Sequence, residues 1–192
     1  QSNVGFDAQL LNGKLSVTGD YFYNLRTNIL WQRAASVPHT SGLTLPRENI
    51  GEVVNQGVEF QVGYGNSLGG LSYTVSVNGG YQENKIKFWD ETPGAPEWQR
   101  STGSPMNTNL VYKAIGIFED QEAVDAYPSW VGARPGDVIF EDVNKDGVID
   151  GLDRIRTQKT DIPTFQGGLN IDLRYKKFYT TIFFQGATGA QR

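Results

Sequence analysis

One short segment of the sequence has the residue types and the spacing of a calcium-binding loop. Asp142, Asn144 and Asp146 are spaced by two, a glycine follows them, and Asp153 occupies the twelfth place counted from Asp142. Calcium takes roughly six to eight oxygen ligands, and such a loop directs the side chains at places one, three and five inward while a glycine permits the sharp bend. The spacing therefore predicts a calcium site.

The remaining predicted ligands lie in the second half of this loop. The peptide carbonyl of Val148 occupies place seven, and Asp150 at place nine would act through a water molecule. Asp153 stands where EF-hands use a longer glutamate, and an aspartate at this place is the form seen in dockerin modules. Asp, Asn and Gly also favour turns without any metal, so a metal-free turn is the alternative.

The surroundings of the loop predict a brace and not a sensor. Pro135 and Gly136 precede it and Pro163 follows it, so no amphipathic segment of helical length flanks it. Sensor-type opening needs such helices. We expect the ion to brace a long loop.

Other chemistry has little support in the sequence. His39 is the only histidine, so a catalytic triad or a multi-histidine metal site lacks its second member. The chain has no cysteine, which excludes disulfides and thiol chemistry. A net charge of -4 with scattered basic residues does not fit nucleic-acid binding. We therefore expect no enzymatic activity and no nucleic-acid partner.

Three tryptophans of the predicted long connections are candidate substrate contacts, because indole rings stack on sugars. They are Trp89, Trp98 and Trp130. Large aromatic side chains also anchor the interior of loops and form belts at membrane interfaces, and this second interpretation is favoured.

The pattern of apolar residues predicts an all-β chain. Apolar and polar residues alternate with period two, which indicates strands with one apolar face. The predicted wall strands cover residues 4–10, 15–31, 54–64, 71–88, 165–175 and 178–184. The pattern has one exception, Gln56, which falls on an apolar face.

Short and long connections alternate between these strands. The short ones are predicted at Asn12–Gly13, Gly65–Gly70 and Lys176–Lys177, and the long ones at 32–52 and 88–163. Residues 109–118 look extended without clean alternation, and residues 119–126 suggest one short helical turn. We assign both to a long insertion at 88–163, because only then do all the short turns lie at one end.

The predicted chain has six alternating strands of roughly ten residues, short turns at one end and aromatic residues near the strand ends. This combination is typical of an antiparallel up-and-down transmembrane β-barrel. Asp7, Asp20, Glu59, Asp172 and Arg174 fall on the polar faces, as in the wall of a wet lumen. Six strands cannot close a wide barrel, so the sheet would need further strands. The alternative is a soluble, calcium-braced β-sandwich that binds glycans or mediates adhesion.

Four sequence blocks, in this order, resemble the SusC/RagA-type TonB-dependent outer-membrane transporters. The blocks are 20–30, 49–60, 136–150 and 162–190, beginning Asp-Tyr-Phe-Tyr-Asn, Asn-Ile-Gly-Glu-Val, Gly-Asp-Val-Ile-Phe and Ile-Pro-Thr-Phe-Gln. They span nearly the whole chain, and their combination is specific although each alone would be weak.

The resemblance implies that residues 1–192 are part of one 22-stranded barrel in the outer membrane of a Gram-negative bacterium. It implies a lumen closed by an N-terminal plug, which this chain lacks, and coupling to the TonB complex through that missing part. It further implies a SusD-like surface lipoprotein as lid, and glycans or peptides as the imported substrate. The calcium loop, 142–153, would lie on the extracellular side.

Overall fold

The computed structural model describes residues 1–33 and 46–191. Residues 34–45, which include His39 and most of the predicted 32–52 loop, lie outside this description. In the described part of the chain, no helix is long and apolar enough to cross a membrane.

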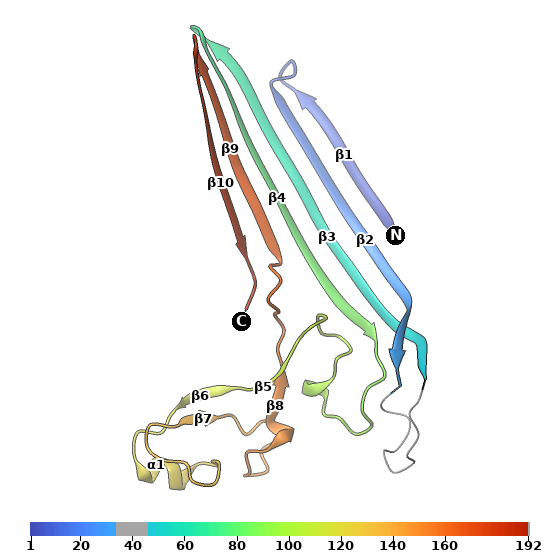
Figure 1. Ribbon diagram of the computed structural model, residues 1–192, viewed down its shortest axis with the longest axis vertical. Coiled ribbons are helices and arrows are strands. Elements are labelled where there is room, and N and C mark those ends of the chain that lie inside the picture. The colour runs from blue at the N-terminus through green and yellow to red at the C-terminus, as the bar shows by residue number, and fades with distance from the viewer. Residues whose placement is uncertain (34–45, 192) are drawn as a thin grey trace.

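Most of the chain forms one antiparallel sheet of six strands in the order β1-β2-β3-β4-β9-β10. The strands are β1 (Ser2–Leu10), β2 (Leu15–Gln32), β3 (Arg47–Leu68), β4 (Leu71–Phe88), β9 (Phe165–Tyr175) and β10 (Phe178–Thr188). Each strand pairs with its sequence neighbour in the sheet, which is the up-and-down order expected from the sequence. The three short turns lie at one end of the sheet, and the insertion between β4 and β9 lies at the other (Figure 1).

The insertion between β4 and β9 folds into a small module of its own. It contains the strands β5 (Leu110–Tyr112), β6 (Ala114–Ile117), β7 (Val138–Phe140) and β8 (Arg154–Arg156), the helix α1 (Gln121–Ala126), and two 3₁₀ turns, Glu97–Gln99 and Gly151–Asp153. β5 pairs with β8 and β6 with β7. The residues from 109 to 118 therefore belong to the insertion and not to the wall, as the alternation of short and long connections predicts.

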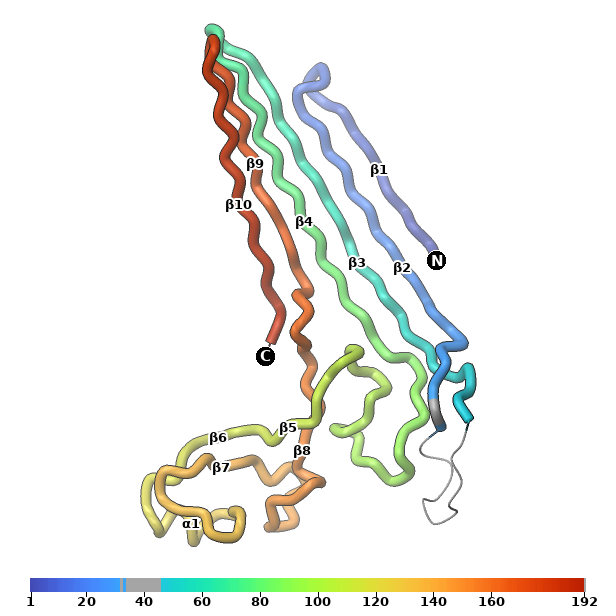
Figure 2. Tube along the Cα trace, viewed as in Figure 1, coloured from blue at the N-terminus to red at the C-terminus, as the bar shows by residue number. Residues whose placement is uncertain are grey.

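The module lies beyond the loop end of the sheet, and the chain enters and leaves it through strands that are hydrogen-bonded neighbours (Figure 2). Its buried apolar residues are few and come from separate segments. Phe118, Val124 and Ile149 are the buried hydrophobic side chains there, and the last of these belongs to the predicted calcium loop. Packing thus fixes one side of that loop.

The strand lengths differ from the prediction. β2 and β4, with 18 residues each, agree with the predicted 15–31 and 71–88 to within one residue, whereas β3 has 22 residues against the predicted 54–64, and the general length of roughly ten residues is too short for all three. Residues 47–52 extend β3, although the sequence predicted a loop there, and the turn predicted at 65–70 shrinks to Gly69–Gly70. β10 likewise continues to Thr188 and not only to 184. The added residues do not alternate between apolar and polar types, so the pattern did not predict them as parts of strands.

The alternation of apolar and polar residues inverts along β4. Tyr81 ends the apolar series on one face, and Glu83 and Lys85 continue that face as charged residues. The opposite face, polar up to this point, then carries Ile86, which is buried. Residues 103 and 104 of the insertion pair with Ile86 through backbone hydrogen bonds. Beyond Tyr81, where the pairing with β9 ends, residues 103 and 104 of the insertion thus take its place beside β4 at Ile86.

Gln56 is the exception to the pattern of β3. On the apolar face, it lies in the first row beyond Val58 and Tyr81, where the apolar series ends. It is paired with Glu83, and its amide donates a hydrogen bond of 2.9 Å to the Glu83 carboxylate. The residue is therefore a regular member of the charged region beyond the apolar band.

Candidate functional site

The six strands present one continuous apolar face. Register places the apolar residues of neighbouring strands side by side, for example in the row Ala8, Val17, Val62, Val77, Leu169 and Phe184. Between the turn end and the row of Tyr21, Val58 and Tyr81, this face holds no charged residue. Val77 and Phe60 are each 41% exposed, so no second sheet covers them in the described part of the chain.

This exposure decides between the two sequence interpretations. A β-sandwich buries its apolar faces against a second sheet, whereas a membrane barrel leaves them to lipid. Leu71 and Tyr81 are ten residues apart on β4, which is about 33 Å along a strand and about 25 Å in height at the usual barrel tilt. That height matches the apolar band of an outer-membrane barrel, and the alternative of a soluble sandwich is wrong.

The opposite face of the sheet is polar and hollowed. A hollow of about 570 Å³ lies against it, and its lining includes Asp20, Glu59, Gln61, Asn78, Gln166 and Gln185. Asp20 and Glu59 stand directly opposite each other on β2 and β3. Like charges in this arrangement repel, so the site favours a cationic group nearby. Sequence reasoning placed these residues on the lumen face but did not find the hollow, because only the register brings the strands together.

The predicted calcium loop is closed by its own hydrogen bonds. The two Asp142 carboxylate oxygens accept from the backbone N–H groups of Asp146 (3.2 Å) and Gly147 (2.9 Å). The Asn144 side chain accepts from the Asp146 N–H and donates to the Asp146 carboxylate. Gly147 has a φ of 86°, the left-handed conformation that the bend requires. The side chains at places one, three and five thus come together.

The two carboxylates at the far end of the loop have other partners. Asp153 is fully buried at 0% exposure and accepts from the N–H groups of Val143 (2.9 Å) and Asp150 (2.8 Å). Asp150 caps the following 3₁₀ turn by accepting from the Leu152 N–H. Among the residues that the structure describes, no group of three or more His, Cys, Asp or Glu side chains is placed to hold a metal ion. The six predicted ligands are therefore not all brought together.

Side chains from distant segments hold this loop in place. The Trp98 indole N–H donates to the Leu152 carbonyl at 2.8 Å, and the Gln99 amide donates to the carbonyls of Gly151 and Leu152. The Tyr127 hydroxyl accepts from the Asp142 N–H. Sequence reasoning missed Gln99 and Tyr127, since these contacts span long separations and leave no local pattern.

The three candidate tryptophans have three different surroundings. Trp89 packs against Trp31 with ring centroids 3.9 Å apart, at the loop end of the strands. Trp98 anchors the 142–153 loop. Trp130 is 43% exposed, meets the edges of Tyr112 and Phe140, and borders an apolar cavity of about 350 Å³. The structure does not gather them into one site.

Comparisons with known proteins agree with the arrangement of the wall. The family model described as TonB dependent receptor-like, beta-barrel, matches residues 1–189. TonB-dependent receptors P3 and P26 of Formosa agariphila are 28% and 23% identical to the chain over 100% and 97% of its length. The chain spans about a fifth of the length of these relatives.

Solved structures show the same fold. The RagAB peptide importer in its open-open state superposes with a TM-score of 0.73 at 18% identity, over 98% of this chain and 20% of that one. A second RagAB structure gives a TM-score of 0.64 at 18% identity, over 97% of this chain and 20% of that one. The resemblance to SusC/RagA-type transporters is confirmed. This chain belongs to the TonB dependent receptor-like β-barrel family.

Proposed function

We propose that this segment is part of an outer-membrane, TonB-dependent nutrient importer that takes up glycans or peptides together with a SusD-like surface lipoprotein. One observation carries the proposal. The apolar face, which we call the outward face, is uncharged and runs across all six strands, and the opposite face of the same sheet is polar and hollowed. A wall with lipid on one side and a wet lumen on the other requires this division. Coupling to TonB would come from parts of the whole protein outside this chain.

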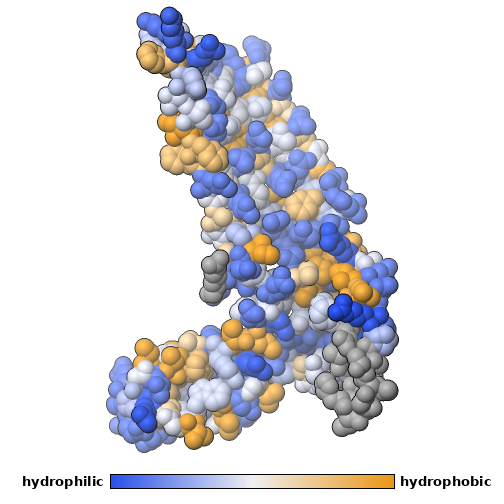
Figure 3. Space-filling model, viewed as in Figure 1, coloured by the Kyte–Doolittle hydropathy of each residue, from blue (hydrophilic) through white to orange (hydrophobic). Residues whose placement is uncertain are grey.

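The loop module supports a protein partner on the extracellular side. Hydrophobic residues are exposed on it (Figure 3), including Ile117, which is 62% exposed, and Trp130 beside the apolar cavity. Exposed apolar surface of this kind marks interaction sites on soluble parts of proteins. We propose that the lid lipoprotein contacts this module.

The substrate class follows from the chemistry of the lumen face. The polar side chains of the hollow are mainly amides and carboxylates, which hydrogen-bond to sugar hydroxyls as well as to peptide groups. Both glycans and peptides therefore fit, and the proposal keeps both.

Uptake by cells that lack the whole transporter tests the proposal. Labelled oligosaccharides and oligopeptides are offered to the deletion strain and to the strain complemented with the parent protein. We expect uptake of one class to be lost and restored, and a surface lipoprotein to copurify with the parent. Unchanged uptake of both classes would contradict the import function. Copurification that survives replacement of residues 82–164 by a short turn between Tyr81 and Phe165, which face each other in the sheet, would contradict only the contact with the module.

We propose in addition that the 142–153 loop binds calcium through Asp142, Asn144, Asp146 and the Val148 carbonyl. The all-oxygen donor set and the converging side chains at places one, three and five fit this ion. The ion would supply positive charge beside the loop carboxylates. Asp150 and Asp153 would join only by exchanging their backbone partners.

The double variant Asp142→Ala with Asp146→Ala tests this site in the whole protein. We expect calcium to slow proteolysis of residues 130–162 in the parent and to have no effect in the variant, while the wall strands stay folded. The control is Glu122→Ala with Asp161→Ala, which removes two exposed carboxylates elsewhere in the module. Equal proteolysis of the parent with and without calcium would show that the ion does not brace this loop.

A further inference from the structure

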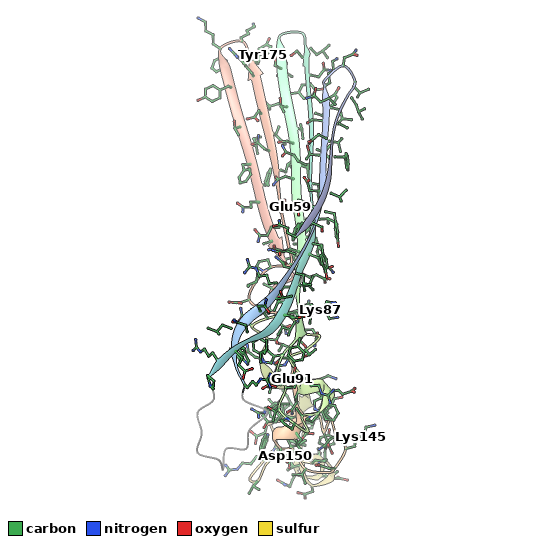
Figure 4. All side chains as sticks on the ribbon, turned by 90° about the vertical axis from the view of Figure 1, so that its right-hand side faces the viewer. Glu59, Lys87, Glu91, Lys145, Asp150 and Tyr175 are labelled. Atoms are coloured by element: carbon green, nitrogen blue, oxygen red, sulfur yellow. The ribbon has the colours of Figure 1, made fainter. Side chains whose placement is uncertain are left out.

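The short turns of the sheet are basic, whereas the module at the other end is acidic. The turn segments 10–15, 68–71 and 175–178 contain Lys14, Lys176 and Lys177 and no Asp or Glu. The insertion from 89 to 163 has 14 acidic and 7 basic residues. Figure 4 shows the two ends, with Tyr175 near the turns and Asp150 in the module. Charge is thus separated along the strand axis.

The cations of the β9–β10 turn lie at the edge of the apolar band. The Lys176 ammonium lies over the Tyr175 ring, 5.2 Å from its centroid. Tyr175 shares its row with Leu71 on β4 and with Phe178 on β10, which is 78% exposed. Aromatic rings followed by lysines are typical of the level at which a barrel meets lipid headgroups.

Among the residues that the structure describes, no ion pair joins these lysines to a carboxylate. The ion pairs of the described residues are Arg33–Glu48 and Lys113–Glu141, and neither involves a turn lysine. The nearest carboxylate along β9 is Asp172, which falls on the polar face and accepts hydrogen bonds from Asn170 and Thr181. All three turn lysines are exposed. Their ammonium groups are therefore accessible to an anion from outside the described chain.

We propose that Lys14, Lys176 and Lys177 form a rim that binds the phosphate groups of anionic phospholipids. The rim continues the uncharged outward face, so headgroups lie beside it wherever acyl chains cover that face. A lysine on a long apolar stem can keep its charge among headgroups while its methylenes stay at the band. Each lysine near an anionic surface contributes on the order of 1 kcal/mol, or about fivefold in affinity.

The test uses the whole transporter in nanodiscs of phosphatidylcholine with or without phosphatidylglycerol. Native mass spectrometry counts the phosphatidylglycerol molecules that stay bound. We expect K176Q/K177Q to weaken this binding by about fivefold for each lysine removed. K176R/K177R should retain it, and added salt should weaken it in the parent.

The matched control is K145Q/K159Q, which removes the same charge from the module at the far end. Heat-resistant migration of each barrel confirms that the variant is folded. Equal phosphatidylglycerol binding by folded K176Q/K177Q and by the parent would overturn the proposal. So would an equal loss in the control, because net charge and not the rim would then govern binding.

Discussion

Val77 and Ser76 are neighbours on β4 that face opposite environments. Val77 lies in the middle of the uncharged outward band, and Ser76 lies on the polar face. We expect Val77→Lys to destabilise the whole barrel by about 2–4 kcal/mol, because it places a charge near the membrane midplane. Urea unfolding in lipid vesicles measures this cost.

Ser76→Lys is the control for this prediction, since it adds the same charge one residue away on the polar face. It should cost much less than Val77→Lys. Equal destabilisation by the two variants would mean that the outward band does not face lipid.

Asp153 is expected to hold the calcium loop even without an ion. Its two oxygens accept from backbone N–H groups at both ends of the loop, and it is fully buried. Asp153→Ala leaves those N–H groups without a partner, at about 1–3 kcal/mol each. Hydrogen exchange in calcium-free buffer should speed up in residues 141–156.

The exposed Asp161 provides the comparison for this effect. Asp161→Ala should leave the exchange rates of residues 141–156 unchanged. If Asp153→Ala also leaves them unchanged, the hydrogen bonds of Asp153 contribute little to the loop.

The row formed by Phe6, Gly19, Phe60 and Gly79 shows how neighbouring strands fit together on the outward face. A Cβ added at Gly79 would lie 2.7 Å from the Phe60 ring, and one added at Gly19 would lie 2.6 Å from the Phe6 ring. The rings therefore occupy the space that side chains on the next strand would fill. Each glycine accommodates a phenylalanine from the strand beside it.

Gly79→Ala is expected to destabilise the wall by about 1–3 kcal/mol, because the Phe60 ring must move. The control is Gly80→Ala on the same strand, where the nearest atom would be at an ordinary 3.6 Å. Unfolding of the two variants in detergent gives the comparison. A Gly79→Ala barrel as stable as Gly80→Ala would show that the ring relocates at no cost.

Period-two alternation predicted the wall strands because each has one face toward lipid and one toward the lumen. The prediction failed where a strand does not have one face toward lipid and one toward the lumen. The outer half of β3, including Val53 and Val54, is covered by other segments, and both of these neighbouring valines are buried. A strand buried on both faces has no alternation, so its sequence resembles an irregular apolar run.

The loop sequence predicted which side chains would converge but not all of their partners. Asp142, Asn144 and Asp146 come together because the distances between them are set locally. The hydrogen bonds of Asp150 and Asp153 are also local, because the two residues form a capping box at the following 3₁₀ turn, an alternative to metal binding that the spacing alone did not reveal. The anchoring of the loop by Trp98 joins residues 54 apart in the sequence, and local spacing carries no information about such a contact.

The six-stranded sheet has two free edges, on β1 and on β10. Unpaired strand edges and an exposed apolar face together promote association between chains. We expect the isolated chain to aggregate in plain buffer and to disperse only in detergent or with the rest of its barrel. Sedimentation velocity measures this, and a monodisperse species in plain buffer would contradict the lipid-facing assignment.

The chain enters the module after β4 and returns at β9, its direct neighbour in the sheet. Tyr81 and Phe165 face each other across the two strands, so a short turn could join β4 to β9 at that level, and lengthening such a loop costs little entropy. The pairing of the wall strands up to Tyr81 therefore does not depend on what the module contains. Mutation and recombination can replace the module while the barrel wall is inherited unchanged.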